Sequence, residues 1–293
     1  MADLLVFGSG GQVGSHLMRL AAEGALHVEG PARPDADLDR PETIAAAIAA
    51  SKAPVVVNAA AWTDVPGAER DEAAAIRANA EAPAVMAQAC ARASKVLIHI
   101  STDFVFDGEK TTPYVESDPV APLNAYGRGK AAGERAVLET YGRALVVRTS
   151  WVFSAQGRNF VTAIRAAGDR PRLDVVEDEI GLPTPADDLA GFLLEAALAL
   201  RDVPAGDPRF GLLHAPGGGA PVSRAEFARM ILTSVGSSAE VVPVTAASRN
   251  DPVRRPANAV LHDGRLQRLW GRSLPDWRLG LARTLAELEE WGQ

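Results

Sequence analysis

The chain has 293 residues, of which 47% are hydrophobic and 23% charged, a balance that is ordinary for a soluble globular protein. This length is enough for one large domain or two modest ones, each with a buried core. The formal net charge of -7 argues against a protein that binds the phosphate backbone of nucleic acids, because such a protein needs a basic face.

Cysteine usage and hydropathy bear on the compartment. Cys90 is the only cysteine, so no internal disulfide can form, and its alanine-rich surroundings predict a buried small side chain. A reducing compartment fits this usage. Only three residues precede the first apolar run, and no apolar stretch reaches about 18 residues, so we expect neither a signal peptide nor a membrane span. We therefore predict a cytoplasmic protein.

Short apolar runs alternate with helix-like segments in the first half of the chain. The predicted strands cover residues 4–8, 25–30, 55–60, 95–102 and 144–150, and the predicted helices cover residues 12–23, 41–51, 72–93 and 125–140. Some of these runs, such as VVVNAA, are continuous rather than alternating, as expected of strands that are buried on both faces. The alternation predicts an α/β fold with a Rossmann-type, doubly wound parallel sheet in residues 1–150.

The pattern loosens after about Trp151. Turn-rich stretches separate shorter predicted helices at residues 186–201, 223–235 and 275–290. We predict that residues 151–293 mainly form a smaller, substrate-binding domain. We also expect the helix at residues 186–201 to pack back on the first domain.

A glycine-rich loop joins the first predicted strand to the first helix. Residues 8–14 read GSGGQVG, with Gly8, Gly11 and Gly14 in the spacing G-x-x-G-x-x-G. Glycines permit a tight turn and let the backbone approach a pyrophosphate, which then lies at the helix N-terminus. The alternative is an ordinary strand-to-helix turn, but the place of the loop in an alternating pattern favours dinucleotide binding.

The loop after the second predicted strand bears on the choice between NAD and NADP. An acidic residue there would bind the ribose 2′-hydroxyl, whereas an arginine would attract a 2′-phosphate. Glu29 precedes Gly30, and Arg33 follows soon after. Arg33 is therefore a candidate clamp for the 2′-phosphate, with a solvated loop arginine as the alternative. This favours NADPH as the cofactor and leaves NADH open.

Tyr126 and Lys130 lie four residues apart on a predicted helix, and hence on one face of it. A phenol exchanges protons poorly at neutral pH unless a nearby positive charge stabilises its anion. The compact ammonium of lysine can do this and can also donate to two vicinal ribose hydroxyls. Only four of the 30 basic residues are lysines, so a lysine at position 130 of a chain that prefers arginine favours a specific role for it. The alternative is a surface lysine beside a half-buried tyrosine.

A hydroxyl group ends the strand that precedes this helix. The strand at residues 95–102 finishes in Ser101-Thr102, followed by Asp103, at the sheet edge where open α/β folds bind their ligands. A hydroxyl at this place can hydrogen-bond a substrate carbonyl and stabilise developing alkoxide charge. Thr102, Tyr126 and Lys130 together predict a proton-relay site.

Several longer segments, in chain order and from end to end, share one resemblance. These segments are GQVG (11–14), NAAAWTDVPGAE (58–69), STDFVFDG (101–108), PLNAYGRGK (122–130), RTSWVF (148–153), NF (159–160), DEIGLPTPADDLA (178–190) and RRPANAVL (254–261). Through them the chain resembles the extended short-chain dehydrogenase/reductases and, within these, the dTDP-4-dehydrorhamnose reductase family.

The resemblance implies an activity and a set of catalytic roles. Hydride would pass from NADPH, or NADH, to the 4-keto group of dTDP-4-dehydro-L-rhamnose, which gives dTDP-L-rhamnose. Tyr126 would protonate the new hydroxyl, Lys130 would hold the nicotinamide ribose, and Thr102 would polarise the keto group. A homodimer is compatible with the resemblance.

The resemblance also implies binding residues. Beyond the relay and Gly8, the cofactor contacts would be Gly11, Gln12 and Val13 at the pyrophosphate, Asp37 with Leu38 beside it at the adenine, and Ala61 and Thr63 along the cleft. Asp103 and Trp151 would contact the deoxysugar, and the indole would offer an apolar face to the 6-methyl group. Arg255 would meet the diphosphate, with a surface salt bridge as the alternative.

Two departures from the family pattern are visible. Some members join their subunits through a metal held by glutamates, one of them just after the glycine loop, where this chain has Ser15-His16. We therefore expect no metal-linked dimer, and the five histidines show no ligand spacing with acids. Trp62 occupies a place that usually holds a smaller or polar ring, which predicts altered cofactor packing.

The same fold supports other functions. A sugar-nucleotide dehydratase needs an adjacent acid and base after the threonine, and here Asp103 is followed by Phe104. Another sugar-nucleotide reductase or a 4-epimerase does not need that pair and stays open. A non-catalytic regulatory subunit that binds the cofactor also stays open, although the complete relay favours catalysis.

Overall fold

A computed structural model describes residues 2–249 and 251–291. Its centre is a sheet in the order β10-β5-β4-β3-β1-β2, in which every neighbouring pair is parallel. The strands are β1 (Leu4–Phe7), β2 (Val28–Glu29), β3 (Val55–Asn58), β4 (Val96–Thr102), β5 (Ala144–Thr149) and β10 (Gly211–His214). Because β2 and β3 lie on opposite sides of β1, the chain reverses its winding there. The predicted doubly wound parallel sheet is confirmed.

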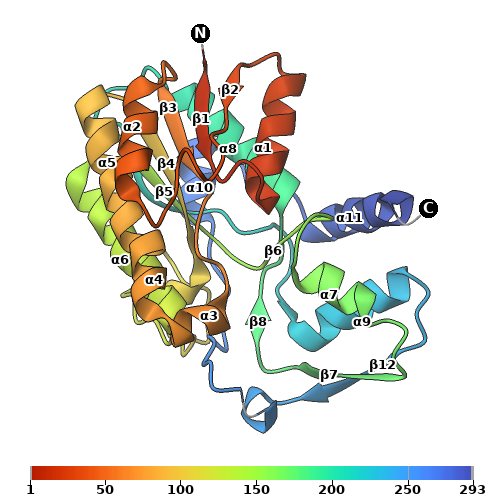
Figure 1. Ribbon diagram of the computed structural model, residues 1–293. Helices are drawn as coiled ribbons and strands as arrows, with labels where there is room; N and C mark the ends of the chain where they lie inside the picture. Colours follow the sequence, from red (N-terminus) through yellow and green to blue (C-terminus); the bar gives the residue numbers. More distant parts are fainter. Residues whose placement is uncertain (1, 250, 292–293) are drawn as a thin grey trace.

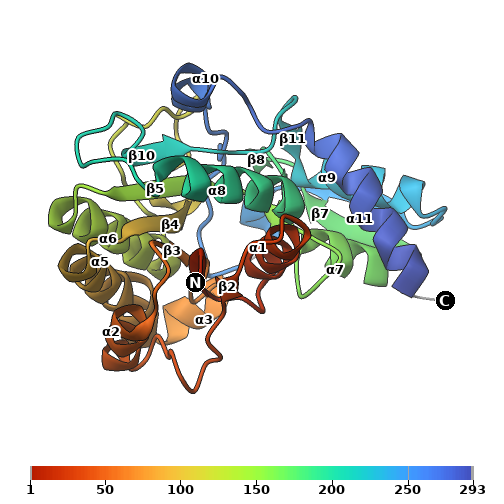
Figure 2. The same cartoon turned by 90° about the horizontal axis from the view of Figure 1, so that it is seen from above.

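Helices cover both faces of the sheet (Figures 1 and 2). One face carries α1 (Gln12–Glu23), α8 (Ala186–Leu200) and α10 (Gly264–Trp270), and the other carries α2 (Pro41–Ala50), α5 (Ala82–Ala93) and α6 (Ala125–Thr140). Successive strand residues point to opposite faces, so Val55 and Val57 of β3 pack toward α1 and α8 while Val56 packs toward α2 and α5. This is why the strands are apolar throughout.

The helical run predicted at residues 72–93 contains a wider turn. It consists of α4 (Glu72–Ile76), a π-helical turn η1 (Arg77–Glu81) and α5, and a short helix α3 (Val65–Arg70) precedes it. Pro83 has no N–H to donate to the carbonyl of Asn79, which favours a break in the regular ladder here. That carbonyl faces α6, where a Cβ on Gly133 would come within 2.1 Å of it. Helix α6 therefore approaches η1 very closely.

Two elements from the second half of the chain lie with the central sheet. Helix α8 packs on α1, and β10 pairs in parallel with β5, although β10 was not predicted. The boundary at residue 150 stays a prediction.

Apart from the 3-10 helix η2 (Asp103–Val105), the remaining elements occupy the central, right and lower parts of Figure 1. Many of them surround a second apolar cluster, which includes the fully buried Trp277 and Phe227. These remaining elements are β6 (Val152–Phe153), α7 (Phe160–Ala166), β7 (Arg172–Val176), β8 (Ile180–Gly181), β9 (Thr184–Pro185), β11 (Val222–Ser223), α9 (Arg224–Ser234), β12 (Glu240–Val244), the 3-10 helix η3 (Ala246–Arg249) and α11 (Trp277–Trp291). In the part of the chain that the structure describes, no helix is both long and apolar enough to cross a membrane.

Candidate active site

The glycine loop between β1 and α1 forms a cradle that only glycine can build. Gly8 has a φ of +79°, and a Cβ there would come within 2.7 Å of the Ala60 nitrogen. A Cβ on Gly14 would come within 2.0 Å of the Gly8 carbonyl oxygen. Gly11 precedes α1 without a side-chain cap, so the first N–H groups of the helix can bind an anion. These residues fit the pyrophosphate of a dinucleotide.

Gln12 links this cradle to the second half of the chain. Its Oε1 accepts hydrogen bonds from Asn159 Nδ2 at 2.9 Å and from Ser154 Oγ at 3.1 Å. Asn159 also caps α7, because its Oδ1 accepts from the backbone N–H of Thr162. Sequence reasoning matched Asn159 to a family segment but missed this contact.

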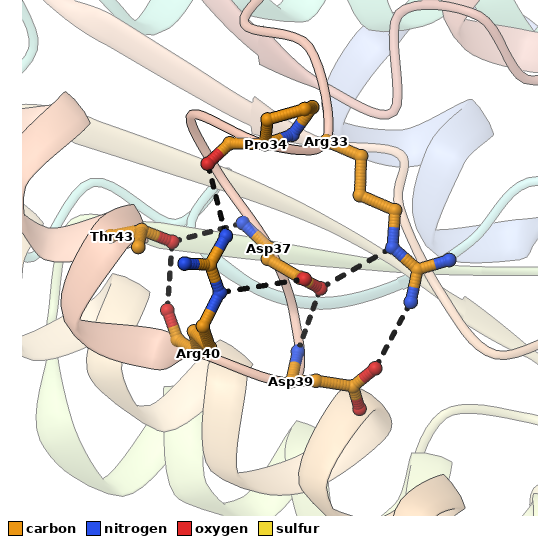
Figure 3. A network of polar contacts seen from close by, with 6 residues as sticks. All are labelled: Arg33, Pro34, Asp37, Asp39, Arg40 and Thr43. Atoms are coloured by element: carbon orange, nitrogen blue, oxygen red, sulfur yellow. Dashed lines mark hydrogen bonds and ion pairs between the residues drawn. The ribbon is translucent and has the colours of Figure 1, made fainter.

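The loop after β2 is organised around Asp37 (Figure 3). Asp37 Oδ1 accepts from the backbone N–H of Asp39 at 3.1 Å and from Arg33 Nε at 3.4 Å, and Arg40 Nε lies 3.7 Å from Oδ2. The Asp39 N–H, followed by the nearby arginines, holds the pKa of Asp37 below its ordinary value. Arg33 is mostly exposed and also donates to Asp39 Oδ2 at 3.0 Å. Two arginines thus flank the predicted adenine contact.

The loop after β3 is hydrogen-bonded to η1. The backbone N–H and carbonyl of Trp62 bond to the side chain of Asn79, at 2.9 and 3.0 Å. Trp62 and Tyr126 both pack against one small apolar cluster, which consists of Ala68, Ala75 and Ala125. Ala61 and Thr63 flank Trp62, and Thr63 is exposed. A π-helical turn such as η1 is frequent at functional sites.

The three relay residues come from neighbouring elements. Thr102 ends β4, and Asn124 caps α6 by accepting from the backbone N–H of Gly127 at 2.8 Å. Lys130, on the same helix as Tyr126, is 2% exposed, and its Nζ donates to the Ile100 carbonyl of β4 at 2.7 Å. Helix α6 therefore lies against the carboxyl end of β4.

Burial controls the protonation of these groups. It raises the pKa of Tyr126 to about 12, with the Thr102 hydroxyl acting against this and the Asp103 charge adding to it. Burial lowers the pKa of Lys130 to about 8, against the attraction of Glu134. Near pH 7 the phenol is thus protonated and the lysine is mostly an ammonium. Burial also raises the pKa of Asp103 to about 7.

Asp103 is fully enclosed beside Thr102. It is 2% exposed, and its Oδ1 accepts from Thr102 Oγ1 at 2.9 Å. Among the residues that the structure describes, its Oδ2 has no hydrogen-bond partner. This oxygen keeps its capacity to accept a hydrogen bond.

A cavity of about 940 Å³ opens on the second half of the chain. Predicted substrate residues Trp151 and Arg255 line it, and Arg255 Nη1 is bound to Asp251 Oδ2 at 2.7 Å. Its other charged lining residues are Arg158, Glu179, Arg224, Arg249, Asp251 and Arg254. Sequence reasoning missed Arg224, because nothing in the pattern SRAE beyond a helix start indicated that its side chain would reach the site.

The predicted residues thus fall into four groups: the loop after β2, the glycine cradle, the relay with the loop after β3, and the cavity. Asn124 connects the last two, since its Nδ2 donates to the Arg254 carbonyl at 2.8 Å. Within residues 2–249 and 251–291, no group of three or more histidine, cysteine, aspartate or glutamate side chains could hold a metal ion.

A family model described as RmlD substrate binding domain matches residues 1–290. The chain belongs to this RmlD family. A dTDP-4-dehydrorhamnose reductase from Burkholderia thailandensis is 43% identical to it over 296 residues, which cover 97% of this chain and 98% of the relative.

Solved structures of RmlD-type reductases have the same fold. A dTDP-4-dehydrorhamnose reductase from Clostridium acetobutylicum superposes with a TM-score of 0.91 at 30% identity, covering 98% of this chain and 99% of the other. One from Bacillus anthracis, solved in complex with NADP, gives a TM-score of 0.90 at 28% identity, with 98% and 100% covered.

Proposed function

We propose that this protein reduces dTDP-4-dehydro-L-rhamnose to dTDP-L-rhamnose with NADPH, or with NADH, as a cytoplasmic enzyme. The observation that carries the proposal lies at the carboxyl end of β4: Lys130 bonds to the Ile100 carbonyl, and the Thr102 hydroxyl lies within hydrogen-bonding reach of Tyr126, in a chain of the RmlD family. The glycine cradle supports a dinucleotide cofactor, and the NADP complex of the Bacillus anthracis relative supports the phosphorylated form.

The cofactor supplies the hydride that reduces the sugar carbon. Tyr126 donates its proton to the carbonyl oxygen as that oxygen gains charge, and the Thr102 hydroxyl polarises the same carbonyl. The Lys130 ammonium stabilises the phenolate that Tyr126 becomes and holds the ribose of the cofactor. The pKa of Tyr126, about 12 in this structure, suits a donor that must stay protonated until the reaction.

The substrate spans the space between the relay and the cavity. Asp103 and Trp151 form the sugar end, and Arg255 forms the diphosphate end among the other arginines of the cavity. Positive charge there complements a sugar carried on a diphosphate. Arg33 takes the 2′-phosphate of NADPH, and a second copy of the chain completes a dimer without a bridging metal.

The experiment is an incubation with NADPH or NADH and a dTDP-4-keto-6-deoxyhexose while the absorbance of the reduced nicotinamide is followed. We expect oxidation of the cofactor and a dTDP-6-deoxyhexose product. If neither cofactor is oxidised, the proposal is wrong. If Tyr126→Phe turns over as fast as the natural protein, the relay is wrong, although the fold stands.

A further inference from the structure

Arg224, the first residue of α9, is held in one pose in the cavity wall. Its Cζ lies 3.4 Å from the centroid of the Trp151 ring and 5.0 Å from that of Phe160, so the guanidinium stacks on the indole. Gly181 packs against the same indole, since a Cβ on it would come within 2.5 Å of Cε2. The arginine thus covers an indole face of the kind that sequence reasoning assigned to the sugar.

The Arg224 guanidinium keeps hydrogen-bonding capacity to spare. Its side chain is only 17% exposed, and the nearest carboxylate oxygen, Glu179 Oε2, lies 3.7 Å from its Nε. Its Nη atoms make no hydrogen bond to any described residue, whereas Arg255 in the same cavity is bound to Asp251 and to the Val253 carbonyl. Because Arg224 lines the cavity, a ligand there can accept hydrogen bonds from these donors.

Asp103 offers the complementary acceptor. Its buried Oδ2 has no partner within the described residues, and the positive charge of Arg224 acts against burial to lower the Asp103 pKa. The two side chains therefore lie within electrostatic reach of each other. Arg224 therefore supplies a donor, and Asp103, bonded to Thr102, supplies an acceptor in the same region of the site.

The chemistry of this pair favours a hydroxyl over a phosphate. Around Arg224 lie two acids, Asp103 and Glu179, and one arginine, Arg255, so its surroundings are not uniformly positive. A phosphate oxygen only accepts, and it cannot form a hydrogen bond with the carboxylate of Asp103. A sugar hydroxyl can donate to the carboxylate and accept from the guanidinium at the same time.

We propose that Arg224 is a specificity-determining residue that donates to a ring hydroxyl of the substrate sugar, with Asp103 as the acceptor and Trp151 as the platform that orients the guanidinium. This inference rests on the proposed function. It gives the indole a positioning role toward Arg224 in place of direct stacking on the sugar.

The test compares three substrates and one fragment. We measure kcat/KM for the natural protein, for Arg224→Lys and for Arg224→Gln. The substrates are a dTDP-4-keto-6-deoxyhexose and its 2-deoxy and 3-deoxy counterparts. Calorimetry gives the Kd of dTDP for each protein. Arg229→Gln, an exposed change on the same helix, is the matched control. Thermal melting establishes that each variant is folded.

We expect the natural protein to disfavour one deoxy substrate by roughly 100-fold or more, because that sugar leaves buried polar groups unpaired. In both Arg224 variants the ratio of kcat/KM for the full sugar to kcat/KM for that deoxy sugar should fall below about 10-fold. The Kd of dTDP should change by less than about 3-fold. If the Arg224 variants lose kcat/KM equally with all three sugars, the inference is overturned and the role of Arg224 is structural. If their affinity for dTDP falls by the same factor as kcat/KM, the inference is overturned and Arg224 acts on the diphosphate. A natural protein that reduces none of the sugars contradicts the proposed function itself.

Discussion

Gln12 Oε1 and Asn159 Nδ2 lie 2.9 Å apart and join residues 147 positions apart in the sequence. Gln12 begins the helix whose N-terminus is suited to the cofactor pyrophosphate, and Asn159 caps α7 and lines the cavity. One hydrogen bond thus connects the predicted cofactor site with the predicted substrate site.

Gln12→Glu tests the pyrophosphate cradle. The carboxylate can still accept from Asn159 and Ser154, and a negative charge at a helix N-terminus does not destabilise the helix. The same charge repels a pyrophosphate, so we expect KM for NADPH to rise by about 10-fold or more with an unchanged Tm. Gln88→Glu, an exposed change on α5, should leave both values unchanged. An unaltered KM in Gln12→Glu would move the pyrophosphate away from this helix.

Tyr126→Phe tests the proton donor. Removing the hydroxyl should lower kcat by roughly 10² to 10⁴-fold, the usual contribution of a positioned acid, and leave KM for NADPH nearly unchanged. Tyr141→Phe is the control, because the Tyr141 hydroxyl is buried without a partner among the described residues. Steady-state assays measure kcat for Tyr126→Phe and Tyr141→Phe. If the two variants have the same kcat, the role of Tyr126 is contradicted.

Lys130→Arg tests the shape of the cation. The lysine is 2% exposed and its Nζ is fixed on the Ile100 carbonyl, so the larger planar guanidinium cannot take the same place. We expect the variant to keep the charge and lose most of its turnover, about 100-fold. Activity within a few-fold of the natural protein would show that charge alone suffices.

Lys130→Met should be inactive and, near neutral pH, more stable than the natural protein. The pKa of Lys130 falls from its ordinary 10.5 to about 8 on burial, so the unfolded state binds more protons between these pH values. The free energy of unfolding of the natural protein therefore rises with pH across this window. The free energy of unfolding of the variant should exceed that of the natural protein by a constant amount below pH 8, and the difference should vanish near pH 10.5. Urea denaturation across this pH range measures it. A pH-independent difference would contradict this.

Glu134→Gln tests a buried ion pair that lies one helical turn beyond Lys130. Glu134 and Arg148 are joined by hydrogen bonds of 2.6 and 2.8 Å, and their side chains are 5% and 3% exposed. Removing one charge leaves the other uncompensated, so we expect a loss of about 3–5 kcal/mol in the free energy of unfolding. Glu139→Gln, exposed on the same helix, should cost less than about 0.5 kcal/mol. Similar losses in both would assign the effect to the helix rather than to the pair.

The sequence by itself determined the local elements and much of the site chemistry. Helices α1 and α6 have the predicted bounds, because apolar periodicity and the flanking turn residues are local signals. The glycine cradle was predicted for the same reason, since its spacing lies within seven residues. Tyr126 and Lys130 share a helix face by simple geometry.

Only the tertiary structure decided which distant segments meet. Strand β10 completes the sheet beside β5, Gly133 lies close against the Asn79 carbonyl, and Arg224 stacks on Trp151. Hydrophobic periodicity reports which face of an element is buried, but it does not report which partner buries it. For that reason the sequence indicated a reductase relay, and the fold was needed to show the partly buried Arg224 on Trp151 and a carboxylate beside Thr102 with one oxygen unpaired among the described residues.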